Sequence, residues 1–424
     1  MDKVIFWFRR DLRFDDNTGL LAALAQNESV LPLFIFDELI INELAPDDPR
    51  VGFIYESLKV LDDKLKTYGS GILAIKGDPL EVWKEILKKE KVSKVYSNKD
   101  YEPYARERDK KVEEMLGEAS VDFYQFKDQV IFEEGEIVKD NQEPYHVFTP
   151  YKNKWLKNFK PTVSFKSVTF ENFYKQTISF PTLDELGFKQ PNIKVKDFDL
   201  SLIRQYGSVR DFPSKNGGTH LGPHLRFGTV SIRQLIEKVR LSSDVLLSEL
   251  IWREFFMQIL FHYPRVVHQN FKTKYDGITW RNDQSDFEKW CLGQTGYPMV
   301  DAGMRELNKT GCMHNRVRMI TAGFLCKHLL IDWRWGEAYF ASKLLDFELS
   351  SNNGNWQWAA GTGCDAAPYF RIFNPYEQLK KFDKEMAYIR KWIPEFDTPD
   401  YPEPMVDHKF ARERALTTYK VGLE

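Results

Sequence analysis

The side chains best suited to chemistry lie on one predicted helix in the second half of the chain. Glu249, Trp252 and Arg253 share a face there, because residues three and four positions apart are neighbours on an α-helix. A carboxylate beside an indole can hydrogen-bond the edge of a nucleobase while the indole stacks on its ring. An ion pair between Glu249 and Arg253 next to a half-buried Trp252 explains the same spacing. The pattern by itself leaves both interpretations open.

A second group of chemically suggestive residues is the run 352–365, which reads Asn-Asn-Gly-Asn-Trp-Gln-Trp-Ala-Ala-Gly-Thr-Gly-Cys-Asp. Trp356 and Trp358 are separated by one residue and framed by amides and glycines, which suits a helical core poorly. The same frame suits a pocket that holds a flat ligand and stays polar at its edge. Aromatic residues make up 15% of the chain, with 11 Trp. This abundance favours flat ligands or aromatic-rich packing.

Two further segments carry weaker signals. Residues 217–228 combine glycines with a threonine and two histidines ahead of a predicted helix, where backbone N–H groups can bind a phosphate. Residues 310–319 place His314 before two arginines that alternate with apolar residues. A glycine-rich loop is more often only a loop, and a histidine beside arginines is more often structural. Neither segment identifies a site by itself.

The elements that must hold these residues differ along the chain. Residues 1–130 alternate short apolar runs with amphipathic stretches, which predicts a parallel sheet covered by helices on both faces. The predicted strands are 4–8, 30–36, 72–75 and 92–96. Periodicity fades where prolines are spread through the sequence, and helical periodicity dominates further on. We therefore predict an α/β domain with a Rossmann-like sheet at 1–130, an inter-domain connector at 131–200 and an all-α domain at 201–424.

Composition narrows the class of protein. A length of 424 residues exceeds the usual size of a single core, and 42% hydrophobic with 29% charged residues is ordinary for a globular protein. The net charge is only −2, but basic residues outnumber acidic ones from residue 201 onward, so an anionic partner would bind there. The four cysteines lack metal-site spacing, and no signal peptide or membrane-length apolar run is present. We expect a cytoplasmic protein without a metal ion or a membrane span.

Taken together, these motifs resemble those of the DNA photolyase/cryptochrome family over nearly the whole chain. The segments that carry the resemblance are 9–13, 206–213, 217–228, 249–256, 310–319 and 346–365. The closest match is to class I photolyases that repair cyclobutane pyrimidine dimers (CPDs). It implies a carbon–carbon lyase in which photoexcited reduced FAD donates an electron to a dimer flipped out of DNA. The alternative from another class is a light-independent nucleic-acid-binding protein that uses its indoles as a stacking platform.

The resemblance also implies roles for individual residues. Glu249 would hydrogen-bond the damaged bases, and Asn352 would face N5 of the flavin. Light would reduce the oxidised flavin through a chain of three indoles, Trp356, Trp333 and Trp280, with Trp290 and Trp335 as nearby alternatives. The implied contacts to DNA are Arg210, Glu249, Trp252, Asn315, Arg316, Met319 and Trp358. The implied contacts to FAD are Tyr206, Thr219, His220, Leu221, Gly222, Arg253, Arg318, Asp346, Glu348 and Asn352.

The chain departs from the family pattern at several positions. The flavin loop 218–222 reads Gly-Thr-His-Leu-Gly, which alters two positions where the family usually has side-chain hydroxyls. Cys312 stands where an aromatic residue is expected, and Asn355 stands where most relatives have Gly. The consequence of these three changes stays open. Tyr104-Ala105 replaces the Asn-Glu pair of folate-binding relatives, which weakens folate as a second, antenna chromophore and leaves a deazaflavin, another flavin or an empty site.

Two alternatives within the family remain. A cryptochrome-type blue-light photoreceptor would share the fold and the flavin, but this chain keeps the dimer-contacting residues and ends at Glu424 without a long signalling tail. A (6-4) photoproduct photolyase would use a pair of histidines, for which His220 and His224 are candidates. The Glu-Leu-Ile-Trp and Trp-Gln-Trp patterns favour CPDs. We therefore expect a monomeric enzyme whose partner is DNA that contains CPDs.

Overall fold

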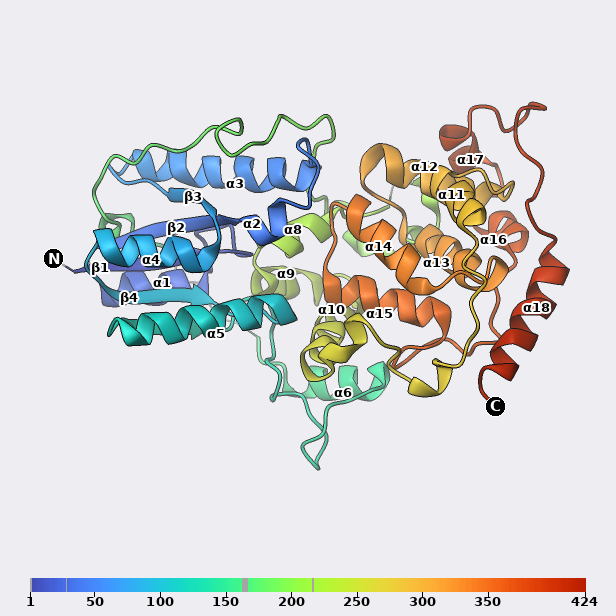
Figure 1. The fold of residues 1–424 in the computed structure, drawn as a ribbon, viewed down its shortest axis with the longest axis horizontal. Helices are drawn as coiled ribbons and strands as arrows, with labels where there is room; N and C mark the ends of the chain where they lie inside the picture. The colour runs from blue at the N-terminus through green and yellow to red at the C-terminus, as the bar shows by residue number, and fades with distance from the viewer. Residues whose placement is uncertain (1, 28, 162–166, 216) are drawn as a thin grey trace. The chain divides into compact units, whose positions relative to one another are not determined.

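The computed structural model describes residues 2–27, 29–161, 167–215 and 217–424, which form two compact units (Figure 1). The first unit comprises Met1–Glu136, Asn158–Phe198 and His220–Leu241. The second comprises Ile137–Lys157, Asp199–Thr219 and Ser242–Glu424. Residues of the predicted connector therefore contribute to both units, and the domain boundaries themselves stay a prediction.

The first unit contains a five-stranded parallel sheet with the order β3-β2-β1-β4-β5. Its strands are β1 (Lys3–Phe8), β2 (Val30–Asp37), β3 (Leu73–Gly77), β4 (Val92–Asn98) and β5 (Asp122–Phe126). The first four match the predicted strands, because each contains a short apolar run; the central strands β1, β2 and β4 are the ones largely buried. The sequence analysis missed β5, an edge strand whose residues are half-buried or exposed. Its Asp-Phe-Tyr-Gln-Phe sequence lacks such a run.

Helices cover this sheet and bury both of its faces (Figure 1). Successive side chains of β1 point to opposite faces, so Phe6 and Phe8 enter one core while Ile5 and Trp7 enter the other. Aspartate N-caps followed by proline start two of the helices, since the carboxylate accepts a backbone N–H that would otherwise lack a partner. The helices of this unit are α1 (Thr18–Gln26), α2 (Glu38–Ile41), α3 (Pro49–Lys66), α4 (Pro79–Lys89), α5 (Pro103–Glu118), α8 (Leu221–Phe227) and α9 (Ile232–Val239).

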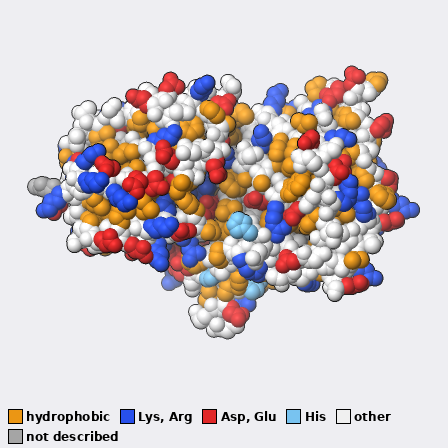
Figure 2. Space-filling model, viewed as in Figure 1, with side chains coloured by type: hydrophobic (Ala, Val, Ile, Leu, Met, Phe, Trp, Pro, Cys, Tyr) orange, Lys and Arg blue, Asp and Glu red, His pale blue; other side chains and the backbone are white. Residues whose placement is uncertain are grey.

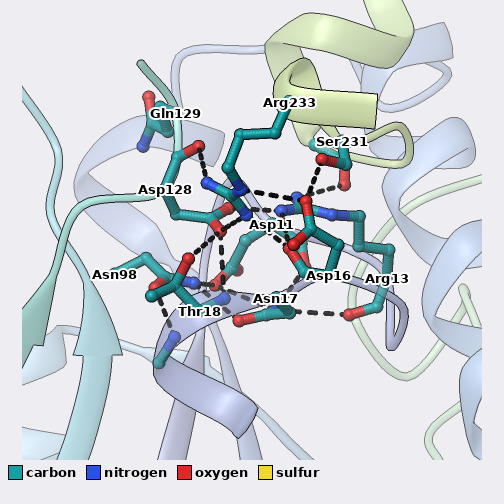
Figure 3. Close-up of polar contacts among 12 residues, drawn as sticks. Asp11, Arg13, Asp16, Asn17, Thr18, Asn98, Asp128, Gln129, Ser231 and Arg233 are labelled. Atoms are coloured by element: carbon teal, nitrogen blue, oxygen red, sulfur yellow. Dashed lines mark hydrogen bonds and ion pairs between the residues drawn. The ribbon is translucent and has the colours of Figure 1, made fainter. Parts of the chain in front are cut away.

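A buried polar network fastens α9 to the loop between β1 and α1 within the first unit (Figure 3). Asp128 is 1% exposed and accepts hydrogen bonds from Arg13 at 2.6 Å, Arg233 at 2.8 Å and the Thr18 hydroxyl at 3.0 Å. Arg233 also donates to Asp16 at 2.9 Å. Burial by itself would raise the pKa of Asp128, but the two guanidinium groups hold that pKa below its ordinary value. The carboxylate is therefore charged, and both of its oxygens accept hydrogen bonds.

The second unit is built around helices, which agrees with the predicted all-α region. Its largest core gathers buried side chains from several of these helices, among them Trp290, Met304, Leu325, Trp333 and Trp356. The helices are α6 (Phe148–Asn158), α7 (Tyr206–Val209), α10 (Asp244–His262), α11 (Gln284–Leu292), α12 (Pro298–Thr310), α13 (Asn315–Gly323), α14 (Trp333–Lys343), α15 (Leu349–Ala360), α16 (Pro375–Phe382), α17 (Ala387–Trp392) and α18 (His408–Val421).

The surface is mixed in character. On the face shown in Figure 2, acidic and basic side chains are interspersed and hydrophobic side chains form small groups. Within the described residues, no helix combines the length and the apolar character that crossing a bilayer requires.

Candidate functional site

Helix α10 carries the first group of candidate residues on its less buried face. Ser243 caps the N-terminus of this helix, because its hydroxyl accepts the N–H of Leu246 at 3.3 Å. Most of its residues from Leu246 to Leu260 are buried, whereas Glu249, Trp252 and Arg253 are half-buried. The predicted shared face is therefore a real feature of the folded helix.

Glu249 is the centre of a small cluster of polar side chains. The Tyr206 hydroxyl donates to one of its carboxylate oxygens at 2.5 Å, and Arg210 forms an ion pair with the other. Arg253 instead pairs with Glu348, through Nε and Nη2 contacts of 3.1 Å each. Burial raises the pKa of Glu249, and Arg210 and Tyr206 oppose that rise. The surface ion pair between Glu249 and Arg253, which the spacing had allowed, is replaced by two pairs that reach to other elements.

Two arginines of α13 are held in the same way. Arg316 contacts Asp211 at 2.8 Å, and Arg318 contacts both carboxylate oxygens of Asp346 at 3.0 and 3.2 Å. Asn315 is exposed at the start of this helix, and Met319 is half-buried about one turn further on. The acidic partners orient each guanidinium group before any ligand binds.

Helix α15 carries the amide and indole residues of the 352–365 run. Asn352 donates to Glu337 of α14 at 2.8 Å, and burial raises the pKa of that carboxyl group. Asn355 is exposed and donates back to the Ser351 carbonyl at 2.8 Å, so its side chain remains at the surface of its own helix. Sequence reasoning missed Glu337, which belongs to none of the motifs. Trp358 is half-buried.

The three tryptophans expected to form an electron-transfer chain differ in their burial and in the rings that they contact. Trp356 is buried and makes an edge contact with Trp290, with ring centroids 6.1 Å apart. Trp333 is buried in the same core, donates a hydrogen bond to Asn270 at 2.9 Å and has Arg334 above its ring. Trp280 is half-buried against Tyr419. Among the described residues, the indole in ring contact with Trp356 is therefore Trp290, which the sequence analysis gave as an alternative.

Similarity to known proteins shows the family of this chain. A family model described as DNA photolyase matches residues 4–169, and one described as the FAD binding domain of DNA photolyase matches residues 246–399. The deoxyribodipyrimidine photo-lyase of Halobacterium salinarum is 35% identical over 98% of this chain and 98% of its own length. The chain belongs to the DNA photolyase family.

Solved structures of photolyases share the fold. A bacterial class III photolyase from Agrobacterium tumefaciens has a TM-score of 0.88 at 32% identity, covering 100% of this chain and 98% of the other. An archaeal photolyase from Sulfolobus tokodaii, solved with two FAD molecules, has a TM-score of 0.84 at 35% identity, covering 99% and 100%. Both the α/β region and the helical region of this chain therefore have the fold of the family.

The helical unit of this chain offers polar groups that fit FAD. Among the described residues, the Ser350 hydroxyl is buried near the start of α15 without a hydrogen-bond partner. Buried polar groups normally have hydrogen-bond partners. A bound ligand would supply the partner that this hydroxyl lacks. Glu348 and Asn352 lie at the start of α15, Arg253 pairs with Glu348 from α10, and Arg318 pairs with Asp346 from α13. Their mixture of donors and acceptors suits the polar edge of an isoalloxazine ring.

The remaining predicted flavin residues lie just before α8 and in its first turn. Thr219 accepts the N–H of Asp199 through its carbonyl at 2.8 Å and belongs to the second unit. His220, Leu221 and Gly222 belong to the first unit, and His220 has a left-handed backbone with φ of 52°. His224 is tied to Thr229 at 2.8 Å and to the Lys196 carbonyl at 2.9 Å. These bonds occupy both ring nitrogens of His224 in a structural role.

Proposed function

We propose that this protein repairs cyclobutane pyrimidine dimers in DNA under light, as a deoxyribodipyrimidine photo-lyase. The observation that carries the proposal is the cluster of Glu249, Tyr206 and Arg210 beside the half-buried Trp252 on α10. It combines a hydrogen-bond acceptor, a phosphate-binding cation and a stacking surface. The photo-lyase relatives match over nearly their whole length, which supports the same activity in this chain.

FAD is the cofactor of this reaction. Arg253, Arg318, Asp346, Glu348 and Asn352 would hold it, together with the Ser350 hydroxyl. When bound in its reduced form, FAD supplies under light the electron that opens the cyclobutane ring of the dimer. The ion pairs of the two arginines keep these side chains in place, so little conformational entropy is lost when the cofactor binds.

Recognition of the dimer must offset the cost of flipping it out of the duplex. Unstacking costs a few kcal/mol and is cheapest for a damaged base pair. Stacking on Trp252 and Trp358 contributes roughly 1–3 kcal/mol per base. Glu249 would accept a hydrogen bond from the flipped bases, and Arg210 and Arg316 would add a salt-dependent contact with phosphates.

A repair assay tests the proposal directly. An oligonucleotide with a single thymine dimer is mixed with the FAD-loaded protein and kept in the dark or illuminated with near-ultraviolet light. Recovery of two thymines, followed by chromatography, is expected only in the light. A matched oligonucleotide with a (6-4) photoproduct should remain unchanged. Binding of FAD without light-dependent recovery of thymine would favour a photoreceptor instead.

Three finer points belong to the same proposal. We infer that the protein acts as a monomer in the cytoplasm, which light scattering after size exclusion and cell fractionation would test. We infer a second, antenna chromophore, a deazaflavin or a flavin in preference to folate. The absorbance spectrum of chromophores released from the purified protein would identify it.

A further inference from the structure

The indole of Trp252 is stacked on a residue from far away in the sequence. The rings of Trp252 and Phe148 have centroids 3.7 Å apart and planes that differ by 10°. Phe148 is 7% exposed, while Trp252 remains half-buried. At this distance and angle the phenyl ring covers one face of the indole, and part of the indole surface is still open.

Phe148 is itself fixed from several sides. Its backbone N–H donates to the Asp365 carboxylate at 3.0 Å, which ties it to the end of the 352–365 run. Its ring meets the edge of Phe255 at 5.8 Å. As the first residue of α6, it has little freedom to move away from Trp252 unless the helix moves too.

Helix α6 is fastened to α10 next to Trp252. Tyr151 and Trp155 follow Phe148 at positions i+3 and i+7, so all three lie on one face of α6. Both donate hydrogen bonds to the buried Glu254 of α10, at 3.3 Å and 2.7 Å. The face of α6 that carries Phe148 is therefore anchored two residues away from the indole.

The Trp252 side chain is also supported from α15. Phe256 lies one turn further along α10 with its ring 5.3 Å from the indole. A Cβ atom added at Gly354 would come within 2.2 Å of the Phe256 ring, so that ring packs directly on the α15 backbone. Phe148 and Phe256 thus leave the indole few alternative rotamers.

We propose that Phe148 is a positioning residue for damage recognition: it backs Trp252 and holds the indole ready to stack on the flipped dimer. This inference rests on the proposed repair function. A stacking surface that is fixed in advance loses less entropy on binding and so gives more selectivity for the dimer over undamaged DNA. Phe148 does not touch the substrate and acts only through Trp252.

The test measures selectivity. Phe148→Ala should weaken binding of a dimer-containing oligonucleotide by about two- to tenfold, the range expected for one aromatic pair, and leave binding of undamaged DNA unchanged. Repair by this variant should show a higher KM with nearly unchanged kcat. Phe148→Leu, which keeps most of the packing volume, should show a smaller effect. Phe148→Tyr, which keeps the aromatic ring, should keep the wild-type selectivity. Fluorescence anisotropy at fixed salt gives both affinities.

Two controls separate positioning from general destabilisation. Trp155→Phe removes one hydrogen bond to Glu254, but the Tyr151–Glu254 and Phe148–Asp365 bonds still hold Phe148 against Trp252, so selectivity should remain at the wild-type value. In a Trp252→Ala background, Phe148→Ala should cause no further loss of selectivity, because the two residues act as one unit.

Either of two results would overturn the proposal: full selectivity in Phe148→Ala, or the same loss of selectivity in Trp155→Phe. Failure of the repair function itself would be seen separately, as absence of light-dependent repair by the wild-type protein.

Discussion

At the scale of single residues, the candidate site is organised by ion pairs that the sequence motifs do not specify. Every arginine expected to contact DNA or flavin has a carboxylate partner: Arg210 with Glu249, Arg253 with Glu348, Arg316 with Asp211, and Arg318 with Asp346. The three partly exposed pairs contribute little to stability, about 0–1 kcal/mol each, whereas the Arg253–Glu348 pair is largely buried. Their main effect is to hold each guanidinium group in one orientation.

The contact between Trp356 and Trp290 leads to a prediction at this scale. Trp290→Phe should slow light-driven reduction of oxidised FAD at least as strongly as Trp333→Phe, because Trp290 is the indole whose ring meets Trp356. Loss of oxidised-flavin absorbance under blue light with an external reductant measures the rate. Trp392→Phe, outside these contacts, serves as the control and should be neutral. A wild-type rate in Trp290→Phe would exclude a route through this indole.

At the scale of elements, close approach between helices positions the indoles. A Cβ atom added at Gly336 of α14 would lie 2.1 Å from the Trp356 ring. Glycine at this position therefore allows α14 and α15 to pack with the indole directly against the backbone. Lys327 supports the other end of α15, where its ammonium group donates to the Ala360 carbonyl at 2.8 Å.

Gly336→Ala should destabilise the helical unit. The added methyl group has to displace Trp356, and overpacking of this kind costs about 1–3 kcal/mol. Urea denaturation and the flavin content of the purified protein measure the effect. Gly323→Ala is the matched control, because the nearest atom to its added Cβ is an ordinary 3.9 Å away. The control should be neutral or stabilise by up to about 1 kcal/mol.

Helix α18 introduces a dependence on pH. His328 is buried and shares a 2.8 Å hydrogen bond with His408 at the start of that helix, and burial lowers the pKa of His328 from 6.5 to about 3. Below about pH 6.5 this histidine is therefore protonated in the unfolded chain but stays neutral in the folded protein. Stability from this group is complete above that pH and is lost as the pH falls towards 3, at about 1.4 kcal/mol per unit.

Replacement of this histidine should reduce the sensitivity to acid. In His328→Gln, the free energy of unfolding should fall less steeply between neutral and mildly acidic pH than in the wild type. Chemical denaturation at several pH values measures both slopes. Equal slopes in the two proteins would show that His328 is protonated in the folded state as readily as in the unfolded chain.

At the scale of the whole molecule, each compact unit is assembled from segments that are separate in the sequence. The first unit needs residues 220–241 in addition to its α/β segment, because Arg233 and Ser231 of that stretch complete the network around Asp16 and Asp128 (Figure 3). A fragment that ends at the predicted boundary near residue 130 would leave that network unfinished.

Asp128→Ala should therefore strongly destabilise the first unit. Removal of the carboxylate leaves Arg13 and Arg233 buried without their shared partner, which costs about 3–5 kcal/mol. Hydrogen exchange of the β1 and β4 amides during denaturation reports on this unit specifically. Glu85→Ala, which breaks an exposed pair with Lys88, should cost far less, because water screens exposed ion pairs. Similar losses in both variants would contradict a structural role for the network.

The sequence by itself determined the features that depend on local pattern. Continuous apolar runs gave four of the five strands, helical spacing put Glu249, Trp252 and Arg253 on one face, and the order of the motifs gave the family. The edge strand β5 escaped because its half-exposed residues carry no such run.

Only the tertiary structure decided which residues meet. Helical spacing allowed a pair between Glu249 and Arg253, but neighbouring elements supplied Arg210 and Glu348 instead. The tertiary structure also places Phe148, from the predicted connector, against Trp252 and Trp290 beside Trp356. The physical reason is that periodicity fixes the direction of a side chain relative to its own helix. Its partners are set by long-range packing, which local spacing does not encode.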